Sequence, residues 1–89
     1  MPYIRPANKE YFEGVIAALH HTAISDSGEL NYLLTEVVKH YLTTHPCKYQ
    51  TLNDVVGALE GCKAEFQRRI VGPYEDKKIA ENGDVYDMS

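Results

Sequence analysis

Apolar residues recur at helical spacing along most of the chain. In the first such segment they fall three or four residues apart, at Phe12, Val15, Ile16, Leu19 and Ala23. We expect this helix to begin after Pro6 with Asn8 as its N-cap, because a short polar side chain there can bond the free backbone N–H groups. The turn-forming residues 25–28 predict its end.

The second segment carries a broader apolar stripe, wide enough to contact two neighbouring helices. Its members are Leu30, Leu33, Leu34, Val37, Val38, Tyr41 and Leu42. A proline pushes the residue before it out of the α-helical region of backbone space. Pro46 therefore predicts that this second helix ends by about Thr44.

The third segment has a marked start and a long apolar stripe. Thr51 and Asp54 resemble a capping box, with the aspartate in place of the usual glutamate or glutamine. The stripe is predicted to be buried and consists of Leu52, Val55, Val56, Leu59, Cys62, Phe66 and Ile70. At Gly72-Pro73 the helix must break or kink, because proline lacks the N–H donor and its ring clashes with the preceding turn.

A short fourth helix is predicted from Pro73, which suits a first helical position, to Asn82 and Gly83, which stop it. Residues 2–5 and 84–87 have extended character, and we consider a two-stranded ribbon between them that would lie on the helices or on a second subunit. The predicted fold class is all-α: a single domain over residues 1–89, with three main helices and the short C-terminal helix in a small bundle.

Size and composition favour association between copies of the chain. With 89 residues, of which 44% are hydrophobic, a single core is only marginally sufficient and oligomerisation is a common supplement. The chain has seven tyrosines and no tryptophan, and tyrosine is enriched at protein interfaces. We therefore expect a homo-oligomer.

Charge and hydropathy exclude several classes of protein. A formal net charge of −4 argues against a general nucleic-acid binder, which normally has a clustered basic excess. No apolar run approaches the roughly 18 residues of a membrane span, and the N-terminus lacks the apolar core of a signal peptide. Cys47 and Cys62 have no CxxC spacing, so we expect reduced thiols in a cytoplasm.

The run ALEGCKAEFQRRIVGPYEDKKIAENGDVY, together with LNYLL in the second helix, resembles a family of small uncharacterised proteins found in phages and bacteria. The resemblance covers most of the chain. It implies a phage-associated setting, and hence the host cytoplasm for a phage-encoded protein. It supplies no activity and no catalytic residues to carry over.

One local basic cluster is a candidate ligand site. Arg68 and Arg69 precede Tyr74 and Lys77. Arginine binds phosphate through two parallel hydrogen bonds and tyrosine stacks on bases, so these four residues could hold a nucleotide or another phosphate. The competing interpretation, which we favour, is that nearby carboxylates pair with these cations; they are Glu65, Glu75 and Asp76.

Other chemistry has weaker support. The four histidines, with Cys47 two residues from His45, lack the paired spacing of a zinc site. For nucleophilic catalysis, Cys62 lies on the stripe predicted to be buried, and Cys47 has no evident set of an orienting base and acid. We predict no metal, no cofactor and no enzymatic activity. The leading hypothesis is a non-enzymatic homo-oligomer that binds another macromolecule, its partner unknown, as a phage or bacterial accessory protein. The alternative is a nucleotide or phosphate binder that uses the basic cluster.

Overall fold

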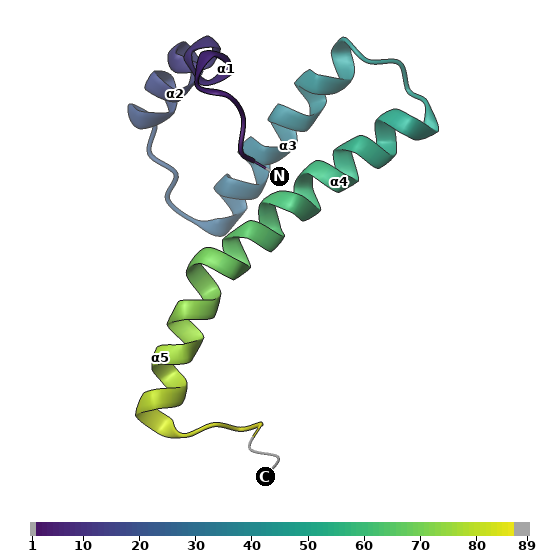
Figure 1. The fold of residues 1–89 in the computed structure, drawn as a ribbon. Helices are drawn as coiled ribbons and strands as arrows, with labels where there is room; N and C mark the ends of the chain where they lie inside the picture. The colour runs from purple at the N-terminus through teal and green to yellow at the C-terminus, as the bar shows by residue number, and fades with distance from the viewer. Residues whose placement is uncertain (1, 87–89) are drawn as a thin grey trace. The chain divides into compact units, whose positions relative to one another are not determined.

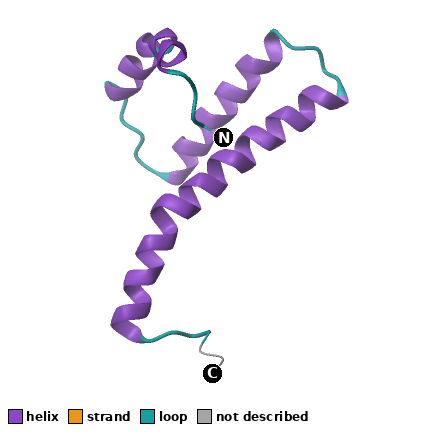
Figure 2. Ribbon diagram, in the orientation of Figure 1, coloured by secondary structure: helices purple, strands orange, loops and turns teal. Residues whose placement is uncertain are grey.

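The computed structural model describes residues 2–86, which form helices joined by short loops (Figure 2). The elements are α1 (Pro6–Tyr11), α2 (Glu13–His20), α3 (Ser27–Thr43), α4 (Tyr49–Phe66), the π turn η1 (Gln67–Val71) and α5 (Gly72–Asn82). Across residues 2–86 there is no strand, and the all-α class is confirmed. Part of the segment considered for the terminal ribbon, Asp87, lies outside the described residues.

Two compact units lie within the predicted single domain. Among the described residues, the first contains residues 3–55 and the second contains Pro2 and residues 56–86. Helix α4 has its first residues in one unit and the rest in the other.

The first helix begins earlier than predicted and is divided. Pro6 occupies the first position of α1, where its missing N–H is not needed, and the Arg5 carbonyl accepts the N–H groups of Asn8 and Lys9 at 2.9 and 3.1 Å. Asn8 therefore lies inside the helix, and its prediction as N-cap is wrong. At Phe12 the backbone leaves the helical region and α1 gives way to α2. Gly14 follows this break, and glycine weakens a helix by about 1 kcal/mol relative to alanine.

Reciprocal hydrogen bonds fix the start of α3. The Asp26 carboxylate accepts the N–H of Glu29 at 2.8 Å, and the Glu29 carboxylate accepts the N–H of Ser25 at 2.7 Å. The turn predicted to end the first helical segment therefore also caps the next helix. At its other end α3 stops at Thr43, as Pro46 predicted.

The start predicted for the third helix at Thr51 is wrong. Helix α4 begins at Tyr49, and the carbonyl of Lys48 accepts the N–H of Leu52 at 3.1 Å. Asp54 bonds the side-chain amide of Gln50 at 2.8 Å. Thr51 is thus a residue of the first helical turn, and at 7% exposed it is the one buried residue in the part of the chain that the structure describes.

Pro73 is accommodated inside a continuous helix. The N–H of Gly72 donates to the carbonyl of Gln67, five residues back, which is the bond of a π turn. The ribbon runs without interruption from the end of α4 into α5 and changes direction there (Figure 1). The predicted interruption is a π turn, and α5 begins at Gly72, one residue before the predicted start at Pro73. Helix α5 ends at Asn82, as predicted, and Gly83 follows with φ of 92°.

The predicted buried stripe of the third helix is exposed, except for Val55, which is half-buried. Leu59 is 45% exposed, Phe66 57% and Ile70 59%. Across residues 2–86 no apolar side chain is buried. Periodicity identified the apolar face correctly, and its side chains are exposed.

Candidate functional site

The exposed apolar face of the second unit is its most extensive chemical feature. We call it the C-terminal stripe, and it consists of Leu59, Cys62, Phe66, Ile70 and Tyr74. All five residues are exposed, and they follow one another at spacings of three or four residues.

The π turn keeps this stripe on one face. In an unbroken α-helix a four-residue step overshoots a full turn by about 40°, so Tyr74 would lie about 80° away from Phe66. Bonding from residue i to i−5 places an extra residue in the turn and reverses most of that drift. Ile70 therefore continues the line of Phe66, and Arg69 lies beside it.

The structure divides the four residues of the predicted ligand site between two elements. Arg68 and Arg69 belong to η1, and Tyr74 and Lys77 belong to α5. Arg68 donates to the Glu65 carboxylate at 2.6 Å, which is an ion pair of the kind that competed with phosphate binding. In the described part of the chain Arg69 and Lys77 form no ion pair.

The cation that contacts Tyr74 is Lys78. Its ammonium lies 5.5 Å from the centre of the tyrosine ring, and it also pairs with Glu81 at 3.3 Å. The four-residue spacing between Tyr74 and Lys78 allows this contact, but the three-residue spacing between Tyr74 and Lys77 allows one equally, because residues three and four apart are both neighbours on a helix. A depression of about 400 Å³ between α5 and the following tail is lined by Lys78, and by none of the four predicted residues.

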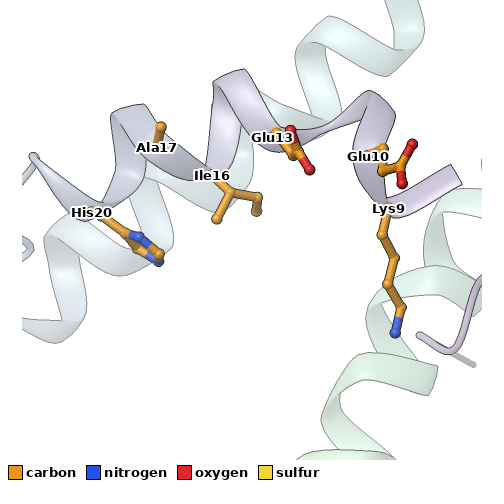
Figure 3. A pocket seen from close by; sticks show the side chains of 6 residues that line it. All are labelled: Lys9, Glu10, Glu13, Ile16, Ala17 and His20. Atoms are coloured by element: carbon orange, nitrogen blue, oxygen red, sulfur yellow. The ribbon is translucent and has the colours of Figure 1, made fainter. Parts of the chain in front are cut away.

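A second shallow depression, of about 390 Å³, lies on α1 and α2. Figure 3 shows the side chains of Lys9, Ile16 and His20 projecting from the same side of these helices. The remaining lining residues are Glu10, Glu13 and Ala17. None of the six is a serine, threonine or cysteine, so the depression does not place a hydroxyl or thiol nucleophile beside His20.

Two histidines bond the backbone at helix ends. Nδ1 of His21 lies 2.9 Å from the carbonyl of Ala17, and Nδ1 of His45 lies 2.8 Å from that of Tyr41, whose ring stacks on the imidazole at 3.8 Å. Within residues 2–86 no group of three His, Cys, Asp or Glu residues is arranged to hold a metal ion. These histidines therefore bond carbonyl groups near the helix ends, and the Tyr41 carbonyl also accepts the N–H of Thr44 at 3.4 Å.

One pKa is shifted along α3. A hydrogen bond of 3.0 Å from Lys39 to the Glu36 carboxylate, together with the negative charge of that group, raises the pKa of Lys39 above its ordinary value. Lys39 is therefore a cation throughout the physiological pH range.

None of the helices described is both long enough and apolar enough to cross a membrane.

Comparison with known proteins places the chain in a family. No curated protein and no solved structure matches the chain. The resemblance to a family of small uncharacterised proteins is confirmed, because the family model described as Domain of unknown function (DUF6899) matches residues 1–85, and the chain belongs to that family.

Proposed function

We propose that this chain is a non-enzymatic interaction protein that acts as a homo-oligomer and binds another macromolecule. The observation that carries the proposal is that no apolar side chain of residues 2–86 is buried, although the helices have clear apolar faces. Burial of apolar surface is the main favourable term in folding, so these faces need a covering surface. Other copies of the chain supply it, and the predicted helical bundle is then built between subunits.

Sedimentation velocity at low micromolar concentration tests the proposal. We expect a dimer or a larger species. A single species of 10.1 kDa would overturn the homo-oligomer. Native mass spectrometry of the same sample adds the copy number and any retained ligand.

The biological setting in the proposal is that of a phage or bacterial accessory protein in the cytoplasm, or in the host cytoplasm for a phage-encoded chain. The resemblance of the C-terminal run to phage and bacterial proteins supports this setting. Crosslinking in cells that express the protein at its natural level, followed by identification of the attached macromolecule, tests it. Recovery of crosslinks between copies of the chain alone would contradict a separate partner.

The second candidate function is binding of a nucleotide or phosphate at Arg68, Arg69, Tyr74 and Lys77. It is supported by Arg69 and Lys77, which form no ion pair among the described residues. The Arg68–Glu65 pair opposes it. A rise of several degrees in melting temperature with a mononucleotide, lost when Arg68 and Arg69 are both replaced by alanine, would favour this function over the first.

A further inference from the structure

We propose that two copies of the chain pair through their C-terminal stripes, with the helices antiparallel and Arg69 of one copy level with Arg69 of the other. This inference deepens the proposed homo-oligomer by assigning its interface and orientation. The occupant of the stripe is thus a second copy of the same segment, and two features of that segment select it.

The first feature is interdigitation. In this alignment Phe66 of one copy lies at the height between Ile70 and Tyr74 of the other, and Ile70 lies at the height between Phe66 and Ile70. Phe66, Ile70 and Tyr74 each therefore enter a space between two stripe side chains of the facing helix, as in knobs-into-holes packing. The alignment depends on the π turn, because without it Ile70 and Tyr74 would rotate away from the face that Phe66 occupies.

The second feature is charge complementarity. The same alignment brings Lys63 of one copy level with Glu75 of the other, and Glu60 level with Lys78, and two-fold symmetry repeats each pair. Lys63 and Glu75 form no ion pair within the described residues, so both are available. Lys78 already forms an ion pair with Glu81, so the pair between Glu60 and Lys78 is the weaker of the two.

The alignments centred on Phe66 and on Ile70 place a cation, and not Glu75, at the height of Lys63. With Phe66 as the central residue, Lys63 is level with Arg69 of the other copy. With Ile70 as the central residue, it is level with Lys77. A parallel pair sets every charge against itself. Repulsion of this kind selects register and orientation in paired helices.

The proposed alignment brings the two Arg69 side chains to the same height. Arg69 lies about 100° around the helix from Ile70 and so stands beside the stripe, not on it. A long arginine side chain there extends its guanidinium into solvent, where water and salt screen the repulsion.

Charge reversal tests the pairing. Lys63→Glu alone, or Glu75→Lys alone, should weaken dimerisation about tenfold at low salt, because each change acts twice in a symmetric dimer. The double variant K63E/E75K should return to within about threefold of the wild-type dissociation constant. The matched control is Lys48→Glu, which makes the same charge change at the residue before α4 and should leave the dissociation constant unchanged.

The outcomes separate this inference from the proposed function. A wild-type chain that sediments only as a monomer overturns both. A dimer that K63E weakens and the double variant fails to restore overturns the antiparallel alignment and leaves the homo-oligomer in place. A dimer insensitive to all three variants also overturns the alignment.

Disulfide crosslinking gives a second readout that does not depend on charge. In a Cys47→Ser background, the two Cys62 residues of the proposed dimer lie about 20 Å apart along the axis, so oxidation should give no crosslinked dimer. Adding Tyr74→Cys places a thiol about 3 Å along the axis from Cys62 of the other copy, and crosslinked dimer should form. Crosslinking through Cys62 alone would indicate parallel helices and overturn the inference.

Discussion

Gly57 and Gly83 occupy opposite kinds of backbone, and the same substitution should act on them in opposite directions. Gly57 lies inside α4, and a Cβ built there meets nothing within 4 Å. Gly83 follows α5 with φ of 92° and ψ of 153°, a conformation that is almost restricted to glycine. A side chain introduced at position 57 would point to a different face of the helix from the C-terminal stripe, since Gly57 is two residues from Leu59.

We expect Gly57→Ala to raise the free energy of unfolding by about 0.5 to 1 kcal/mol, through better helix propensity and a less flexible unfolded chain. Gly83→Ala should lower it by about 1 to 3 kcal/mol through backbone strain. Urea denaturation at one fixed protein concentration measures both. A loss of stability in Gly57→Ala would show that another helix packs closely against that face.

At the scale of the element, helix ends were predictable where one residue decides them. Pro46 and Gly83 act on their own neighbours, so the stops of α3 and α5 follow from the sequence alone. The start of α4 depends on which carbonyl accepts the first N–H groups of the helix. The carbonyl of Lys48 accepts the N–H of Leu52, so the helix begins before Thr51 and the Thr51 side chain does not cap it. The π turn has the same character, because proline signals an interruption without specifying its geometry.

The cap of α3 is open to a direct test. Asp26→Ala should lower the free energy of unfolding by about 1 kcal/mol, because the N–H of Glu29 then loses its acceptor. Asp26→Asn should retain most of the stability that the cap contributes, since asparagine caps a helix as well as aspartate does. Equal losses in the two variants would mean that charge, and not the hydrogen bond, stabilises this end.

Replacing Pro73 tests the role of the π turn. Pro73→Ala restores a donor N–H and removes the ring, so an ordinary α-helix becomes favourable through residues 67–73. Tyr74 then rotates away from Phe66, and we expect circular dichroism to show equal or higher helicity while the dimer dissociation constant rises. A dimer of unchanged affinity would show that α5 takes no part in association.

At the scale of the whole molecule, the apolar faces were predictable and their exposure was not. Helical periodicity assigned Leu59 and Phe66 to one face correctly, but periodicity carries no information about what covers that face. The basic cluster divided in the same way. The Arg68–Glu65 pair follows from spacing, whereas the choice of Lys78 over Lys77 beside Tyr74 depends on the exact rotation of α5.

Leu59→Ala and Phe66→Ala should each lower the free energy of unfolding by up to about 2 to 5 kcal/mol. This loss appears only when partner chains cover the stripe. The wild-type melting temperature should therefore rise with protein concentration, and in these variants the rise should be smaller. Differential scanning calorimetry over about a hundredfold range of concentration measures this. A full cost at the lowest concentration, with no concentration dependence, would mean that the stripe is covered within one chain.

The absence of a buried apolar residue between residues 2 and 86 has a consequence for the abundance of the folded protein in the cell. In the proposed assembly a newly made chain completes its fold only on meeting another, so maturation is a second-order reaction in nascent protein. When chains are synthesised at a low rate, each remains unassembled for longer, and the unassembled chain is the state that proteases cut. Steady-state abundance should then respond more steeply than linearly to the rate of translation.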